Sequence, residues 1–125
     1  MPKVAPDGVM DAAFDFIDQA DMMHVCSTLD SSPTYAEIVA ASLADVAVTP
    51  NTDFTKADGT TSGRKVTVAA KSAVTVDASG DASHIALVTV SGQVVRYVTT
   101  CTTQTLTAGN TVNIPAWSVE ITDPT

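Results

Sequence analysis

The residues with the greatest potential for chemistry are a histidine and a cysteine two positions apart, His24 and Cys26. They fall in a stretch that reads as a strand, where alternate residues share a face, so they could be two zinc ligands or a thiol beside its base. The whole chain has 2 His and 2 Cys, and all would have to converge on one zinc. No flanking signature of a cysteine-hydrolase family surrounds Cys26. We therefore interpret the pair as a buried thiol and a histidine on a half-exposed strand.

An acidic stretch has part of a calcium-binding pattern. Asp77, Ser79 and Asp81 alternate like the first ligands of a calcium loop. Gly80 is misplaced for an EF-hand, and the closing Glu is missing. We interpret the stretch as a solvated surface loop, and we interpret His84, just beyond it, as a strand-end residue with a local hydrogen bond.

The run GTTSGRK at residues 59–65 looks superficially like a phosphate loop, but it lacks the spacing and a following helix. Arg64 and Lys65 are instead expected to pair with carboxylates, possible partners being those of a neighbouring subunit. The sequence thus predicts no catalytic residue, no cofactor and no metal site.

Composition limits the remaining possibilities. The 125 residues suit one domain, and a net charge of −8 would repel a nucleic-acid backbone. No apolar run is long enough to span a bilayer, and Met1–Asp18 is too acidic for a secretory signal, so synthesis in a cytoplasm is expected. Cys26 and Cys101 lie in strand-like segments and are expected to be buried thiols, with a mutual disulfide as the alternative.

The elements that would position these residues begin with a proline-bearing extended arm, Met1–Pro6. An amphipathic helix is predicted over Gly8–Ala20, with Asp7 as its N-cap. Its apolar face carries Met10, Ala13, Phe14 and Ile17, and its polar face carries Asp11, Asp15 and Asp18. The sandwich is expected to fill residues 22–125.

The next segments alternate between strand and turn patterns. Met22–Leu29 reads as a strand, and Thr34 with Glu37 has the spacing of a capping box that begins a short helix over Tyr35–Ala41. Asp45–Val48 is expected to be a short edge strand. Thr52–Gly63 reads as polar turns. Two further strands are predicted at residues 64–70 and 73–76, followed by the surface loop at 77–82.

The stretch from Ser83 to Thr122 is the predicted centre of the fold. It contains three β-branched segments, separated by the turn signals Ser91-Gly92 and Ala108-Gly109-Asn110, which typically join antiparallel strands. In the first segment His84, Ala86, Val88 and Val90 share one face, and Ile85, Leu87 and Thr89 share the other. Trp117 is expected to pack over one end. The predicted fold is mainly β, an antiparallel β-sandwich of jelly-roll type with one amphipathic N-terminal helix and a short second helix.

These segments, in this order, resemble small β-sandwich virion structural proteins of tailed bacteriophages. The segments that carry the resemblance are VMDAAFDFI, MMHVCST, PTYAE, SGRK, SHIALV, VVRYVTTCT and LTAGNTVNIPAWSVEI. The resemblance extends from about Met10 to Thr125 and is strongest in the phrase LTAGNTVNIP, which begins at Leu106. It is a pattern of small and apolar residues, and it transfers no active site.

The resemblance implies a non-enzymatic structural component of a virion, assembled in the host bacterial cytoplasm in many copies, as a homo-oligomer and with other virion proteins such as a major capsid protein or tail and fibre proteins. Capsid decoration (cement), head fibre, and tail or fibre-base roles are all compatible with it. The alternative is a receptor-binding or carbohydrate-binding module, although sparse aromatic residues disfavour a sugar platform. A small hydrolase using Cys26 and His24 is a third alternative. The residues expected to contact neighbouring subunits are Pro2, Lys3, Val4, Pro6, Tyr35, Ile38, Arg64 and Trp117.

Overall fold

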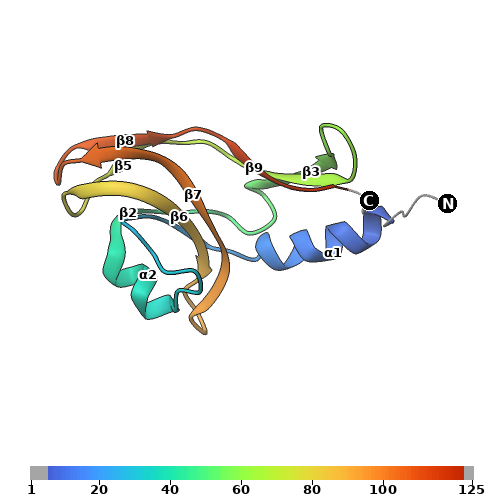
Figure 1. Cartoon of the computed structure of the whole chain (residues 1–125), viewed down its shortest axis with the longest axis horizontal. Coiled ribbons are helices and arrows are strands. Elements are labelled where there is room, and N and C mark those ends of the chain that lie inside the picture. Colours follow the sequence, from blue (N-terminus) through green and yellow to red (C-terminus); the bar gives the residue numbers. More distant parts are fainter. Residues whose placement is uncertain (1–5, 123–125) are drawn as a thin grey trace.

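The computed structural model describes residues 6–122, which form a mainly β structure with antiparallel sheets and two helices (Figure 1). The predicted fold class is therefore confirmed. The elements are α1 (Asp7–Ile17), β1 (Met22–Cys26), α2 (Tyr35–Ala41), β2 (Ser42–Ala47), β3 (Phe54–Asp58), β4 (Arg64–Val68), β5 (Lys71–Thr75), β6 (Gly80–Thr89), β7 (Val94–Leu106), β8 (Thr111–Ile114) and β9 (Trp117–Ile121). The described strands divide into sheets of four, three and two strands, which differs from the double sheet of an ideal jelly roll.

The largest sheet has the strand order β2-β1-β6-β7, and all its neighbours are antiparallel. β6 and β7 are joined by a turn in which Gln93 N–H donates to Val90 O (3.2 Å) and Gly92 has a φ of 82°. Glycine adopts this conformation at little cost, so the predicted Ser91-Gly92 hairpin is confirmed. β2 lies at one edge, as expected for the strand predicted at Asp45–Val48, although it begins at Ser42 and ends at Ala47; the 13-residue β7 lies at the other edge.

The two smaller sheets are β3-β4-β9 and β5-β8. The prediction that Thr52–Gly63 consists of polar turns is wrong in part, because β3 occupies its centre. Phe54 is buried and pairs with Val68, whereas the rest of β3 is exposed or half-buried. Backbone pairing with β4 holds this strand in place, and such pairing leaves little hydrophobic pattern in the sequence.

The Ala108-Gly109-Asn110 turn carries the chain from one sheet to another. Gly109 has a φ of 90°, and its N–H donates to Val76 O (2.9 Å). The turn is confirmed, but the expectation that it joins two paired strands is wrong. β8 pairs with β5, and β7 pairs with β6, so the two strands separate after the turn.

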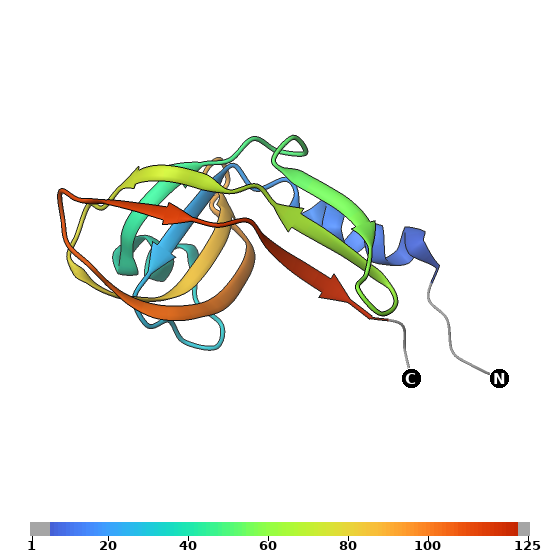
Figure 2. The same cartoon turned by 90° about the horizontal axis from the view of Figure 1, so that it is seen from above.

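The four-stranded and two-stranded sheets together curve into a partly closed barrel. An isolated antiparallel bridge between Ala44 and Val76 links β2 to the end of β5. Neighbouring strands then run β8-β5-β2-β1-β6-β7 around the core, with α1 and the three-stranded sheet extending to one side (Figure 2). Among the described strands, no ladder joins β7 to β8.

α1 confirms the predicted amphipathic helix, although it ends at Ile17 instead of Ala20. Met10, Phe14 and Ile17 are buried as expected, whereas Ala13, expected on the same face, is exposed at its margin. The prediction of an Asp7 N-cap is wrong, because Asp7 is the first helical residue and Pro6 occupies the cap position without a side-chain hydrogen bond.

Asp18 also departs from its expected place on the polar face of α1. It is the C-cap residue and is only 2% exposed, because the chain turns inward there towards β1. Its carboxylate lies 3.2 Å from Lys56 Nζ, and Gln19 Nε2 donates to it at 3.0 Å. Lys56 also pairs with the exposed Asp15. A buried carboxylate at the negative end of a helix dipole depends on such a cation.

α2 begins with the predicted capping box. Glu37 N–H donates to Thr34 Oγ1 (3.2 Å), and Thr34 N–H donates to Glu37 Oε1 (3.1 Å). Replacing Thr34 by alanine is expected to lower the free energy of unfolding by about 1 kcal/mol, because a helix N–H loses its acceptor. Urea denaturation would measure this change. A Thr34→Ser variant keeps the acceptor and should stay close to the wild type, and equal losses in both variants would contradict the assignment.

Both faces of the central strands are buried, against different partners. Leu87 and Met23 belong to the main core, whereas Ala86, Val88 and Cys26 belong to a second cluster formed with Ile38 of α2. The predicted alternation of faces in β6 is therefore confirmed. The second face is covered by α2, which explains why three consecutive residues, 86–88, are all fully buried.

Several element boundaries differ from the prediction. β1 ends at Cys26 instead of Leu29, and β6 begins at Gly80, inside the stretch expected to be a surface loop. The two strands predicted at residues 64–70 and 73–76 are β4, which ends two residues earlier, and β5, which begins two residues and ends one residue earlier. In the described part of the chain, no helix is long and apolar enough to cross a membrane.

Candidate functional site

His24 lies on β1 and is buried, not half-exposed as expected. Its Nδ1 is 2.9 Å from Ser42 Oγ, and the Ser42 hydroxyl donates to Ala44 O (3.2 Å). The hydroxyl has one proton, so His24 Nδ1–H must donate to it. Burial lowers the pKa of His24, and the negative charge of Asp45 partly opposes this shift. The hydrogen bond therefore places a proton on Nδ1, and burial favours the neutral form of the imidazole.

Removing His24 should change the pH dependence of stability. Below the ordinary histidine pKa of 6.5, the unfolded chain binds a proton that the folded chain rejects, so the free energy of unfolding should fall as the pH decreases. In a His24→Gln variant this fall should become shallower, whereas a His84→Gln variant should retain it. Urea denaturation between about pH 5 and pH 8 would test this. The same slope in wild type and His24→Gln would contradict it.

Cys26 is fully buried, and its Sγ donates to Ile38 O (3.6 Å). Burial raises the pKa of Cys26 to about 12, and the nearby Cys101 adds to the shift. A thiol with this pKa stays protonated at neutral pH and is a poor nucleophile. Both cysteines are free, and Cys101 is only half-buried, so the expectation of two buried thiols holds fully for Cys26 alone. Within residues 6–122, no three side chains of His, Cys, Asp or Glu are placed to hold a metal ion.

The stretch with the partial calcium pattern makes local hydrogen bonds. Ser79 Oγ accepts from Ala108 N–H (2.9 Å), and Asp81 Oδ1 accepts from Thr105 Oγ1 (2.9 Å). These contacts attach residues 77–82 to β7 and to the turn after it. The side chains of Ser79 and Asp81 therefore hold this stretch against β7 and the following turn.

The run at residues 59–65 forms the hairpin between β3 and β4, in which Gly59 N–H donates to the oxygen of Gly63 (2.9 Å). Arg64 Nε donates to Asp11 Oδ1 and its Nη1 donates to Asp58 Oδ1, both at 3.0 Å. The expected pairing of Arg64 with carboxylates is confirmed, and both carboxylates belong to the same chain.

Trp117 is the first residue of β9 and packs against the main core. One face of its ring stacks on Tyr97, with centroids 6.1 Å apart and planes 26° apart. Its Nε1 is buried and has no hydrogen-bond partner within residues 6–122. A buried indole N–H usually finds an acceptor, so this atom marks a place where one is missing.

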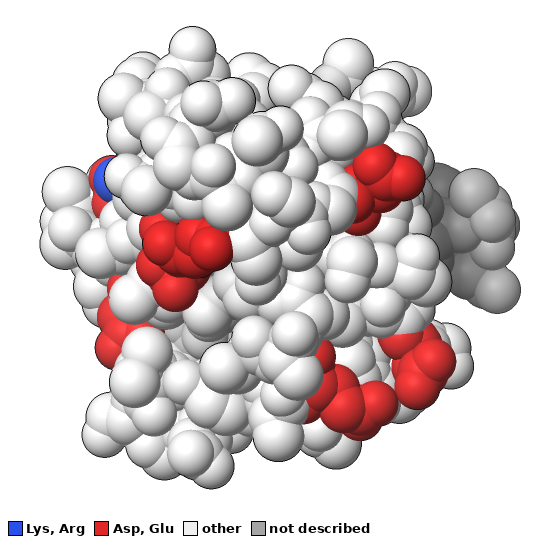
Figure 3. Space-filling view, turned by 90° about the vertical axis from the view of Figure 1, so that its left-hand side faces the viewer, with Lys and Arg blue, Asp and Glu red and all other residues white. Residues whose placement is uncertain are grey.

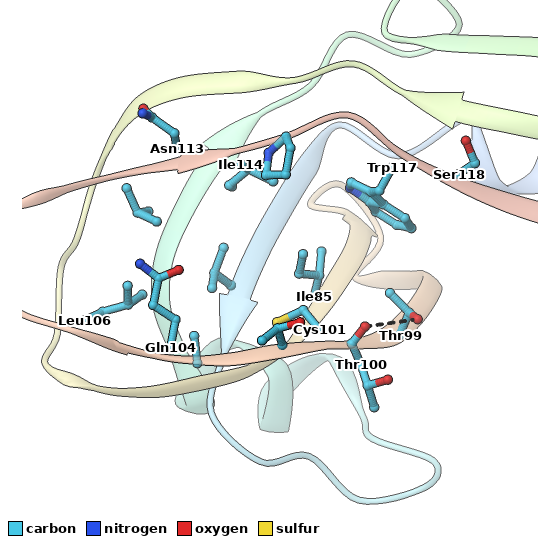
Figure 4. A pocket seen from close by; sticks show the side chains of 15 residues that line it. Ile85, Thr99, Thr100, Cys101, Gln104, Leu106, Asn113, Ile114, Trp117 and Ser118 are labelled. Atoms are coloured by element: carbon cyan, nitrogen blue, oxygen red, sulfur yellow. Dashed lines mark hydrogen bonds between the residues drawn. The ribbon is translucent and has the colours of Figure 1, made fainter.

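Trp117 lies at a cavity of about 440 Å³, which we call the open seam. The open seam runs between β7 on one side and β8 with the start of β9 on the other (Figure 4). Val25, Ala82 and Ile85 also line it, from the inner faces of β1 and β6. It thus occupies the place where β7 and β8 separate and the barrel is not closed.

The described residues that line the open seam include no Asp, Glu, Lys or Arg. Apolar side chains such as Ile85, Leu106 and Ile114 mix with threonines, one thiol and two amides. Figure 4 shows Ile85, Cys101 and Trp117 directed towards the same space. Such a surface can bind apolar side chains and uncharged polar groups, and it lacks a general acid or base.

The residues expected to contact neighbours do not form one site. Pro2, Lys3 and Val4 lie outside the described residues. Pro6 is exposed and Tyr35 is half-buried against the second core cluster. Ile38 is 0% exposed, so its inclusion is corrected here: it is a core residue, because α2 turns it towards β1 and β6.

Sequence reasoning missed two features. The first is the open seam, for which the only signal is a long threonine-rich strand without Lys, Pro or acidic residues between Tyr97 and Leu106. The second is the outer face of α1, where Val9 and Phe16 are 61% and 50% exposed. Their spacing of seven places them on one side of the helix, a signal that was present in the sequence.

Comparison with known proteins yields no relative. No protein-family model matches the chain, and neither a curated protein nor a solved structure matches it.

Proposed function

We propose that the chain is a non-enzymatic structural component of a tailed-phage virion, a capsid decoration or head-fibre protein that assembles in many copies. The proposal begins from the sequence resemblance to small virion β-sandwich proteins. The strongest phrase of that resemblance, LTAGNTVNIP, comprises the end of β7, the turn after it, β8 and Pro115. These residues form one wall of the barrel and contain no reactive group.

The observation that carries the proposal is that α1 has apolar side chains on two sides. Met10, Phe14 and Ile17 pack inward. Val9 and Phe16 point outward and are 61% and 50% exposed, with the exposed Ala12 and Ala13 between them. An exposed apolar stripe on a helix is typical of a surface that a neighbouring protein covers.

The charge distribution supports assembly through uncharged contacts. The net charge of −8 keeps separate copies apart and soluble. Figure 3 shows a face on which acidic side chains form separate patches, surrounded by uncharged surface with almost no basic group in view. Arg64, Lys56 and Lys71 are engaged with carboxylates of their own chain. The neutral and apolar surface between the acidic patches is therefore the part that like-charged copies could share.

The side chains that could act as a base or a nucleophile are buried in contacts within the chain, which supports a non-enzymatic role. Burial lowers the pKa of His24, whose Nδ1–H donates to Ser42, and burial raises the pKa of the Cys26 thiol to about 12. Neither is placed in the open seam. A hydrolase using this pair would need an accessible thiolate.

Quantitative mass spectrometry of purified particles tests the role. We expect the chain in particles at a copy number of roughly hundreds, as suits a symmetric shell. A Val9→Ser/Phe16→Ser variant should be incorporated at least about tenfold less, while Val90→Ser, another exposed valine at 47%, should be incorporated normally. Absence from particles, or normal incorporation of the double variant, would contradict the proposal. A copy number of only a few would assign the chain to the tail or fibre base.

One observation favours a receptor-binding or carbohydrate-binding module as the second candidate, namely the presence of Trp117 in the open seam. Sugars stack on exposed aromatic faces, but one face of Trp117 is already covered by Tyr97. A glycan array decides between the candidates. Binding that is lost in Trp117→Ala would overturn the structural role.

A further inference from the structure

We propose that the open seam is a strand-acceptor site: it binds an extended, uncharged segment of a different polypeptide, which lies between β7 and β8 and completes the barrel. The proposed function supplies only the source of this segment, which would be another virion protein. The site itself is argued from the hydrogen bonding, shape and polarity of the seam.

The first argument is the backbone. β7 pairs only with β6, and β8 pairs only with β5, among the described strands. Each strand therefore has an edge without a ladder, and both edges border the same cavity. Unpaired N–H and C=O groups along a strand edge are a template for another extended chain.

The second argument is that the seam-lining part of β7 lacks the charges and prolines that block many edge strands. Charged residues and prolines normally block an edge strand, and neither occurs from Tyr97 to Leu106. The pairing register shifts between Ala82 and His84, opposite Thr100–Gln104 of β7. Such a bulge displaces residues from the ladder, and here Thr100, Cys101 and Thr102 all line the open seam. The bulge thus exposes this part of β7 towards the cavity.

The third argument is the side chains that an inserted segment would meet. Val25, Ile85 and Ile114 form an apolar lining suited to inward-facing side chains of a strand. Trp117 Nε1 lacks an acceptor among the described residues, and a backbone carbonyl of the segment would supply one. Because no charged residue lines the seam, a charged side chain would be desolvated there without a partner.

These features favour a single segment over other occupants. An isolated extended segment offers two free backbone edges, as a seam bordered by two edge strands requires, whereas a strand already paired in a second copy offers at most one. The chain's own Met1–Pro6 arm fits poorly, because Pro2 and Pro6 lack an N–H and Lys3 is charged.

The test uses the whole chain and a displayed library of random octapeptides. We expect enrichment of peptides that lack charge and alternate β-branched or aromatic residues. Synthetic copies should shift the fluorescence of Trp117, the single Trp of the chain, and should slow the labelling of Cys101 by a thiol reagent at least about fivefold. Methylation of alternate backbone nitrogens in the peptide should abolish binding, because it removes the ladder donors.

Two neighbouring exposed threonines provide a matched control. Thr102 lines the open seam, and Thr103 does not. Thr102→Lys should weaken peptide binding at least about tenfold, and Thr103→Lys should leave it unchanged. Circular dichroism would verify that both variants fold.

Several results would overturn the strand-acceptor site. The first two are that no peptide is enriched, or that the enriched peptides are rich in charged residues. The other two are that the two lysine variants weaken binding equally, or that Trp117 binds glycans and the seam binds no peptide. The experiment is independent of the particle analysis. A chain that is absent from virions could still bind these peptides, and a chain abundant in virions could fail to bind them.

Discussion

Replacing Phe14 by alanine is expected to lower the free energy of unfolding by about 4 kcal/mol. Phe14 is 0% exposed and lies in the main core, on the face of α1 that packs against the three-stranded sheet. Truncation removes most of a large apolar side chain and leaves a cavity, and α1 has few other buried residues with which to close it. Urea or thermal denaturation followed by circular dichroism would measure the loss.

Phe16 provides the matched control, because it is the same residue type on the same helix. It is 50% exposed, and its ring contacts the Arg96 guanidinium at 4.5 Å from the centroid. Phe16→Ala should therefore cost no more than about 1 kcal/mol, mainly through the lost cation–π contact. Equal costs at the two positions would show that the assignment of the inner and outer faces of α1 is wrong.

The second large effect is expected from Lys56→Met, which removes the cation but keeps most of the side-chain volume. The Asp18 carboxylate would then be buried at the end of α1 without its partner. Breaking a fully buried ion pair costs about 3–5 kcal/mol. The Lys56 side chain is 27% exposed, so solvent screening reduces our expectation to about 2–3 kcal/mol. Denaturation at neutral pH would measure it.

Two variants control this prediction. Asp15, the other partner of Lys56, has a side chain that is 61% exposed. Asp15→Asn should therefore lower the free energy of unfolding by less than about 1 kcal/mol. Adding Asp18→Asn to Lys56→Met should recover part of the lost stability, because no unpaired buried charge remains. If the double variant were less stable than Lys56→Met, the loss would have to come from packing and not from the unpaired carboxylate.

These predictions separate residues that hold the fold from residues available to neighbours. Phe14 and the Asp18–Lys56 pair attach α1 to the rest of the molecule. Val9, Phe16 and the open seam lie outside that framework. Changes at these outer positions should therefore alter assembly or peptide binding with little effect on folding, which makes both proposals testable with folded protein.

The sequence by itself determined the elements whose signals are local. The apolar spacing of Met10, Phe14 and Ile17 fixed α1, and the Thr34 and Glu37 spacing fixed the start of α2. The Ser91-Gly92 turn fixed the β6–β7 hairpin. In each case a few neighbouring residues supply the hydrogen bonds, the turn geometry or the apolar face, so the pattern is readable without a partner segment.

Only the tertiary structure decided the features that depend on distant partners. β3 exists because β4 lies beside it, and Asp18 and Ile38 are buried because Lys56 and β1 reach them. The open seam arises because β8 pairs with β5, which leaves one edge of β7 without a partner among the described strands. Strand order depends on which backbone edges meet in the folded chain. The alternation of Val, Ile and Thr that favours each strand is nearly the same for every possible strand order, so the sequence pattern does not predict which strands pair.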